Sequence, residues 1–94
     1  MIPNEKRIEE LYETIISIKD LETCKDFFSD LCTYKEIDMM AQRLESAKKL
    51  INGETYDTII KTTDISSATL SRVSRCVKYG KGYVKVLKSE GKNE

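Results

Sequence analysis

Apolar side chains recur every three or four residues along almost the whole chain, and few residues interrupt this pattern. The 94-residue sequence contains only one proline, Pro3, and four glycines. A spacing of three and four places apolar side chains on one face of an α-helix. A chain with so few helix breakers is expected to fold as several α-helices joined by short turns. The sequence therefore predicts an all-α protein, and its length predicts a single domain over residues 1–94.

Three helices are predicted in the N-terminal half. The first spans about Asn4 to Ser17, and the second follows Asp20, whose carboxylate can cap free backbone N–H groups. The third follows Thr33, which can form a capping box with Glu36, and it ends at Gly53. The apolar faces of these helices contain Ile8, Leu11, Tyr12, Ile15, Leu21, Cys24, Phe27, Phe28, Leu31, Ile37, Met40 and Leu44. A monomer of this length can cover such faces only in part, so we expect a homodimer.

The reactive side chains of the sequence argue against an enzyme. The chain has no histidine, the commonest general base, and it has no glycine-rich phosphate loop or nucleophile elbow. Its three cysteines, Cys24, Cys32 and Cys76, form no C-x-x-C pair, so no metal site is expected. Cys24 and Cys32 occupy apolar helix positions and are expected to pack in the core. We therefore expect no catalytic activity, no metal and no cofactor.

The cysteine count also bears on location. An odd number of cysteines in a sequence without a signal peptide makes a disulfide framework unlikely. No apolar run has the length needed to cross a bilayer, so no membrane partner is expected. The sequence therefore predicts a protein of the reducing cytoplasm.

Charge is distributed unevenly along a chain whose overall net charge is zero. Residues 1–65 carry nine basic and 14 acidic side chains, a net charge of −5, whereas residues 66–94 carry seven basic and two acidic ones, a net charge of +5. This asymmetry predicts a positive face toward the C-terminal end, which is typical of proteins that bind nucleic acid. The alternative is a solvated basic tail without a partner.

Two short helices joined by a tight turn are predicted within residues 55–79. Thr55 can cap the first helix, Ser66 or Ser67 can cap the second, and Gly80 ends the second. A last short helix is predicted around Tyr83, Val84, Val86 and Leu87, and Ser89 to Glu94 are expected to be frayed.

The apolar residues of this segment have the spacing of a helix-turn-helix. Two helices that cross closely need apolar side chains at fixed offsets around the turn, and the offsets of six, five and three are provided by Ile59, Ile65, Leu70 and Val73. Two residues depart from the usual pattern. Asp64 stands where the turn usually has glycine, and Ile60 is bulky where a small residue is usual. The alternative is an ordinary helical hairpin whose serines only cap.

The second helix of this motif is predicted to bind double-stranded DNA. The N-terminal part of a recognition helix enters the major groove, where small side chains allow close approach and hydroxyls can bond bases or phosphates. Arginine can read guanine with two hydrogen bonds, and further cations meet phosphates. The predicted DNA-binding residues are Ser66, Ser67, Ala68, Thr69, Ser71, Arg72, Arg75 and Lys78.

Several strings in the sequence resemble the Trp repressor family. Ala68-Thr69-Leu70-Ser71-Arg72 resembles the start of that family's recognition helix, and Leu50-Ile51-Asn52-Gly53-Glu54 resembles the end of its core helix. With Ala41-Gln42-Arg43-Leu44-Glu45, the chain looks most like the YerC/YecD branch, and the resemblance covers Ile8 to Gly80. It implies an all-helical, intertwined homodimer with two outward helix-turn-helix heads that regulates transcription.

The resemblance also implies a ligand site, which this sequence alters. Two family arginines that bracket bound tryptophan correspond to Arg43 and Arg72. Val73 replaces a glycine and Cys76 replaces a serine that meets the ligand's amino group, so tryptophan is not expected as effector, while another small molecule is compatible with the site. The alternative for Arg43 is an ion pair. Asp57 replaces an arginine that helps to read the family's operator, so the operator is expected to differ.

Two functions follow from the sequence. The first is a sequence-specific transcriptional regulator, most simply a repressor, that binds DNA as a homodimer. The alternative is a helical protein-interaction module that retains the motif as a scaffold. The basic C-terminal segment and the small, polar face of the second helix favour the regulator.

Overall fold

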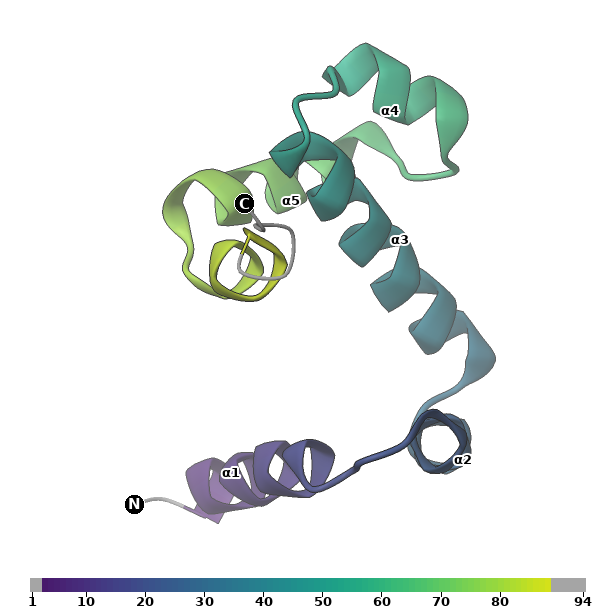
Figure 1. Ribbon diagram of the computed structural model, residues 1–94, viewed down its shortest axis with the longest axis vertical. Coiled ribbons are helices and arrows are strands. Elements are labelled where there is room, and N and C mark those ends of the chain that lie inside the picture. Colours follow the sequence, from purple (N-terminus) through teal and green to yellow (C-terminus); the bar gives the residue numbers. More distant parts are fainter. Residues whose placement is uncertain (1–2, 89–94) are drawn as a thin grey trace. The chain divides into compact units, whose positions relative to one another are not determined.

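A computed structural model describes residues 3–88, and the regular elements within this range are all helical (Figure 1). They are α1 (Pro3–Ile16), α2 (Leu21–Leu31), α3 (Tyr34–Ile51), α4 (Tyr56–Thr62), α5 (Ser67–Tyr79) and the π-helix η1 (Val84–Lys88). The predicted all-α class is therefore confirmed. The expectation for Ser89 to Glu94 lies outside the described residues. None of the helices within residues 3–88 is both long enough and apolar enough to cross a membrane.

The chain divides into two compact units, Met1–Lys35 and Glu36–Glu94. We call them the N-terminal unit and the C-terminal unit. The N-terminal unit contains α1 and α2, and none of its described side chains is buried. Cys24 and Cys32 are only half-buried, so the prediction that they pack in a core is wrong for the single chain, because this unit has no buried core.

The start of α2 is capped as predicted. The Asp20 carboxylate accepts a hydrogen bond of 2.9 Å from the Thr23 backbone N–H. Hydrogen bonds from the Thr23 backbone and side chain, with a smaller contribution from the Glu22 backbone, outweigh the slight desolvation and lower the pKa of Asp20 below its usual value. Farther along α2, the Phe27 and Phe28 rings pack edge to face, with centroids 5.6 Å apart.

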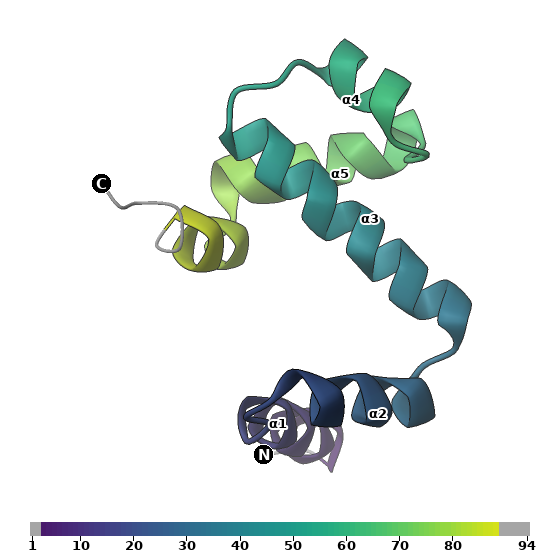
Figure 2. The same ribbon diagram turned by 45° about the vertical axis from the view of Figure 1, so that its right-hand side comes forward.

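The C-terminal unit holds the buried core of the described chain. In both ribbon views α5 crosses α3, and α4 lies beside them (Figures 1 and 2). All three helices contribute to the core, together with the turn before α5 and η1. The buried apolar side chains are Ala47, Ile59, Ile65, Leu70, Val73 and Leu87, with Leu50, Ile51, Val77 and Tyr83 packed against them.

The long helix α3 begins directly after Thr33 and ends before Gly53, as predicted. Gly53 has a positive φ of 91°, which favours glycine. Its N–H donates to the Leu50 carbonyl, and the Glu54 N–H donates to the Lys49 carbonyl, each over 3.0 Å. This pair of bonds is the Schellman motif, and it turns the chain sharply from α3 into α4.

The chain after α5 is helical as predicted but differs in its hydrogen bonding. Gly80 ends α5, and its N–H donates to the Cys76 carbonyl over 2.9 Å. The following helix η1 is a π-helix rather than an ordinary α-helix. Its Leu87 is 8% exposed and joins the core, which attaches η1 to the rest of the C-terminal unit.

Candidate nucleic-acid interface

The two short helices α4 and α5 are held together by the four apolar residues whose spacing predicted the motif. Ile59 of α4 and Leu70 of α5 are both 0% exposed, Val73 is 1% exposed, and Ile65 in the turn is 4% exposed. All four belong to one core cluster. Because Leu70 and Val73 anchor one face of α5 in this core, the opposite face of α5 is directed to solvent. The predicted packing of the helix-turn-helix is confirmed.

Both helices of the motif begin with the same hydroxyl cap. The Thr55 hydroxyl accepts from the Thr58 N–H over 3.1 Å and donates to the Thr58 hydroxyl over 3.0 Å. The Ser66 hydroxyl does the same with Thr69, over 3.2 and 3.0 Å. Ser66 is therefore the cap of α5, which resolves the choice between Ser66 and Ser67. Its hydroxyl proton is used in the bond to the Thr69 hydroxyl, so a hydrogen bond that Ser66 donates to DNA would replace that bond and leave the cap intact.

The turn between the helices depends on Thr63, a residue that the sequence reasoning missed. Its hydroxyl donates to the Ile59 carbonyl over 2.8 Å and accepts from the Ile65 N–H over 3.3 Å. Asp64, which stands at the usual glycine position, has no positive φ. The turn therefore closes through a side chain and needs no glycine. The sequence did contain a signal for this turn: Thr63 lies two positions before the apolar Ile65, and threonine hydroxyls often bond backbone N–H groups two residues later.

Ile60, the other departure from the usual motif, causes no steric conflict. Its side chain is 36% exposed and lies outside the buried core. A bulky residue is acceptable there because the neighbouring Ile59 fills the helix crossing. The two departures are therefore both accommodated by local geometry.

The exposed face of α5 forms a shallow groove. It is lined by Ala68, Ser71, Arg72, Arg75 and Cys76, which recur at helical spacing along one side of the helix. Ser66, Ser67, Ala68, Ser71, Arg72, Arg75 and Lys78 are exposed, whereas Thr69 is half-buried beside its cap. Of the eight predicted DNA-binding residues, four therefore line one groove, and the other four lie on α5 or at its cap.

The cations of α5 are free to meet an anionic partner. Arg72, Arg75 and Lys78 form no ion pair with any described residue. On α4, by contrast, Asp57 pairs with Lys61 over 3.1 Å, and both side chains are more than 70% exposed. Helix α5 thus carries part of the positive charge that the sequence places toward the C-terminal end, whereas the neighbouring helix carries an ion pair.

The two arginines of the expected ligand site are placed differently. Arg72 lines the groove of α5, whereas Arg43 lies half-buried on α3 and is not among the residues that line it. Among the described residues Arg43 has no ion-pair partner, so the ion-pair alternative is not realised there. Val73 is buried in the core, whereas Cys76 is exposed in the groove. Of the two residues that alter the family site, only Cys76 therefore reaches this surface.

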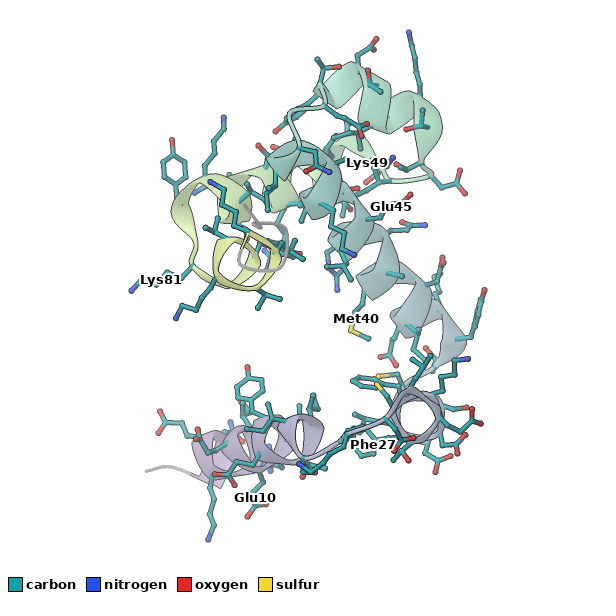
Figure 3. The ribbon with its side chains drawn as sticks, in the orientation of Figure 1. Glu10, Phe27, Met40, Glu45, Lys49 and Lys81 are labelled. Atoms are coloured by element: carbon teal, nitrogen blue, oxygen red, sulfur yellow. The ribbon has the colours of Figure 1, made fainter. Side chains whose placement is uncertain are left out.

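A second hollow lies beside the end of α5 and has an apolar lining. It measures about 510 Å³ and is bounded by Leu44, Cys76, Gly80, Gly82, Tyr83, Val86 and Leu87. Cys76 belongs to both hollows, so the groove on the exposed face of α5 adjoins this apolar surface. Elsewhere in the C-terminal unit, Lys49 of α3 forms a longer ion pair of 3.9 Å with Glu54; Figure 3 labels Lys49 together with Glu45 on this helix.

Comparison with known proteins agrees with these features. A family model described as Trp repressor protein matches residues 6–90. YerC of Bacillus subtilis (strain 168) is 52% identical over 75 residues, which cover 80% of this chain and 72% of YerC. A TrpR-like protein from Eubacterium eligens is 43% identical, with a TM-score of 0.86 over 95% of this chain and 93% of that one.

A crystal structure of a candidate Trp repressor from Staphylococcus aureus is 37% identical to this chain. It superposes with a TM-score of 0.84 over 96% of this chain and 95% of that one. The family match covers most of the sequence and includes every element of the helix-turn-helix. The chain belongs to the Trp repressor family, in the branch that contains YerC.

Proposed function

We propose that this chain binds double-stranded DNA through its helix-turn-helix and represses transcription as a homodimer. The observation that carries the proposal is the exposed cationic face of α5, which has no ion-pair partner among residues 3–88 and is held outward by the buried side chains of Leu70 and Val73. A recognition helix needs this combination of a fixed inner face and a free outer face. Membership of the Trp repressor family supports the same reading.

Different residues of α5 have different proposed roles. Ala68 and Ser71 are small and exposed, so they allow the helix to approach base edges closely. Arg72 lies one turn beyond Ala68 and reads a base, with guanine as the expected partner of its two donors. Arg75 and Lys78 lie toward the end of the helix, where it leaves the groove and meets phosphates. Asp57 on α4 stands where the family has an arginine and is paired with Lys61, so the operator is expected to differ.

The homodimer is proposed because the N-terminal unit leaves its apolar side chains uncovered. Ile16 is 78% exposed and Leu21 is 71% exposed in the single chain. The C-terminal unit in turn has an apolar hollow of about 510 Å³ beside Leu44 and Leu87. A second copy of the chain supplies apolar helices to such a surface. We also propose that residues 1–94 form a single domain.

The regulator is proposed to act in the cytoplasm and without tryptophan. A repressor must share a compartment with its operator DNA, which supports the cytoplasm. A small dimer bound to DNA can block polymerase sterically, which makes repression the simplest output. Cys76 lines the groove where the family has a serine for the ligand's amino group, and a thiol is a poor partner for an ammonium. Calorimetry with L-tryptophan is expected to give no measurable heat, and a micromolar dissociation constant would contradict this. A different effector at Arg43 and Arg72 remains part of the proposal.

The test is a fluorescence-anisotropy titration of the full chain with DNA selected from a random pool and with a scrambled duplex. Wild-type binding is expected to weaken steeply as salt rises, because cations displace condensed counterions. Arg72→Ala is expected to weaken the free energy of binding to the selected duplex by about 1–3 kcal/mol and to reduce the preference for this duplex over the scrambled one. Lys78→Ala is expected to weaken both duplexes equally and to lower the salt slope by about one unit.

Two results would count against the proposal. If Arg72→Ala left affinity and discrimination intact, the assignment of α5 as recognition helix would be wrong. If the wild-type chain bound no DNA at any salt concentration but captured a defined protein partner, the interaction-module alternative would replace the regulator.

A further inference from the structure

The cationic surface of the C-terminal unit extends beyond the recognition helix. Residues 65–88 contain six basic side chains and no acidic one, whereas residues 36–64 contain four basic and six acidic ones. Three of the six cations lie on α5. The other three, Lys81, Lys85 and Lys88, follow it. Half of the positive charge of this segment therefore lies outside the helix that is proposed to read DNA.

The chain after α5 presents these lysines from a fixed backbone. Gly80 packs so closely on α5 that an added Cβ would lie 2.7 Å from the Cys76 carbonyl oxygen. Leu87 anchors η1 in the core, whereas Lys85 and Lys88 near it in sequence are exposed. Figure 3 shows the side chain of Lys81 projecting outward from the ribbon between α5 and η1. Lys81 and Lys85 therefore lie between two attachment points, at Gly80 and at Leu87.

This segment borders the exposed face of α5. Gly80 and Gly82, which flank Lys81 in sequence, line the apolar hollow that shares Cys76 with the groove on α5. Lys81 is thus attached to the backbone beside the C-terminal end of the recognition face. A DNA strand that contacts Arg72 and Arg75 is therefore expected to pass close to Lys81 as well.

Lys81 and Lys85 also stand on one helical face. The Lys85 N–H donates to the Lys81 carbonyl over 3.0 Å, which is the bond of an α-helical turn. Side chains four residues apart on such a turn are neighbours, and two like charges there repel each other. Neither lysine has an ion-pair partner among residues 3–88. A bound anion between or beside them would relieve this repulsion.

We propose that Lys81 and Lys85 bind backbone phosphates of DNA just beyond the bases that meet α5. The inference rests on the proposed DNA binding and extends the contact surface past the helix-turn-helix. A lysine ammonium is a compact charge that suits a phosphate without reading a base. The two residues therefore add affinity and position the protein, and they contribute nothing to the choice of sequence.

The test compares single substitutions in the full-length chain by fluorescence anisotropy over a salt series, on the selected and the scrambled duplex. Lys81→Gln and Lys85→Gln each remove one charge from the proposed edge. Lys48→Gln is the matched control, because Lys48 is an exposed lysine of α3 and its loss changes the net charge equally. Lys81→Arg keeps the charge and is expected to keep the wild-type salt slope.

Each glutamine substitution at the edge is expected to lower the salt slope by about one unit and to weaken binding about five- to tenfold at 0.1 M salt, equally on both duplexes. Lys48→Gln is expected to leave the slope unchanged. An unchanged slope for both Lys81→Gln and Lys85→Gln would overturn the proposal, and so would an equal loss in Lys48→Gln, which would indicate net charge alone. Failure of the wild-type chain to bind DNA would instead refute the proposed function, and this is visible before any variant is made.

Discussion

The two units of the chain have the same helical periodicity but differ in what covers their apolar faces. In the C-terminal unit, Ile59 and Leu70 are 0% exposed because α3, α4 and α5 cross and cover one another. In the N-terminal unit, Ile16 and Leu21 are more than 70% exposed, and α2 buries none of its residues.

The comparison separates two kinds of information in the sequence. Periodicity predicts which face of a helix is apolar, and in the C-terminal unit the predicted faces are the buried ones. It does not state which surface covers that face. The C-terminal unit covers its own face and can hold a recognition helix in place. The N-terminal unit needs another surface, and the proposed homodimer provides one.

The largest effect is expected from truncating the core of the C-terminal unit. Leu70→Ala removes a fully buried side chain and leaves a cavity, so it is expected to lower the free energy of unfolding by about 2–5 kcal/mol. Leu31→Ala truncates a leucine of α2 that is 48% exposed, and within a single chain it is expected to cost about 0.5 kcal/mol or less. Urea unfolding monitored by circular dichroism measures both.

Repeating the urea unfolding at two protein concentrations sharpens the comparison. The loss caused by Leu70→Ala is expected at either concentration, because its contacts lie within one unit. If a second chain covers Leu31, the loss caused by Leu31→Ala is expected to exceed the single-chain value where the chains are associated and to shrink toward it as dilution separates them. Equal losses for the two variants, independent of concentration, would remove the distinction between the units.

An intermediate effect is expected at the turn of the helix-turn-helix. Thr62 and Thr63 each donate a side-chain hydrogen bond of 2.8 Å to the carbonyl four residues earlier, but only Thr63 also accepts from the Ile65 N–H. Thr63→Val keeps the shape of the side chain and leaves that N–H without its partner. It is expected to lower the free energy of unfolding by about 1–3 kcal/mol.

Thr62→Val is the matched control and is expected to change stability by about 0.5 kcal/mol or less, because Thr62 is exposed. Chemical denaturation of both variants, with DNA affinity measured in parallel, gives the comparison. If the two variants proved equally stable, the account of how this turn closes without glycine would be wrong.

The smallest effect is expected in the N-terminal unit, at the cap of α2. Hydrogen bonds from Thr23 lower the pKa of Asp20 below the value of an unfolded chain, about 3.9. The charged carboxylate therefore adds stability above that value, and this stability is lost as the pH falls through the folded-state pKa. Asp20→Asn keeps a good cap that does not titrate.

As the pH is lowered from 5 to 2, the melting temperature of the wild type is expected to fall slightly more than that of Asp20→Asn. The two proteins share every other carboxylate, so the difference isolates Asp20. If the melting temperatures of the two proteins fell equally with pH, the assigned role of this cap would be contradicted.

The sequence predicted well the parts of the fold that depend on local rules. Helix starts after Asp20, Thr55 and Ser66 follow from hydroxyl or carboxylate caps, and the end of α3 follows from Gly53. The core of the helix-turn-helix was also predicted, because four apolar residues at fixed offsets leave little choice of packing.

Features that depend on geometry across the turn or between helices were not predicted. The role of Thr63 depends on the path of the chain after α4, which no propensity specifies. Ser46 is fully buried on α3, and its hydroxyl has no hydrogen-bond partner among the described residues. Cys24 was expected in a core because it lies at an apolar helix position, but periodicity could not reveal that its unit covers nothing by itself.

The central claim is that two chains act together on one DNA site, each through its own C-terminal unit. Sedimentation velocity with a fluorescent duplex that carries the selected near-palindromic operator measures this directly. Two half-sites about 34 Å apart suit two recognition helices in successive major grooves. The account predicts two chains per duplex at saturation and a dimer in the absence of DNA. One chain per duplex, together with a stable folded monomer at micromolar concentration, would contradict it.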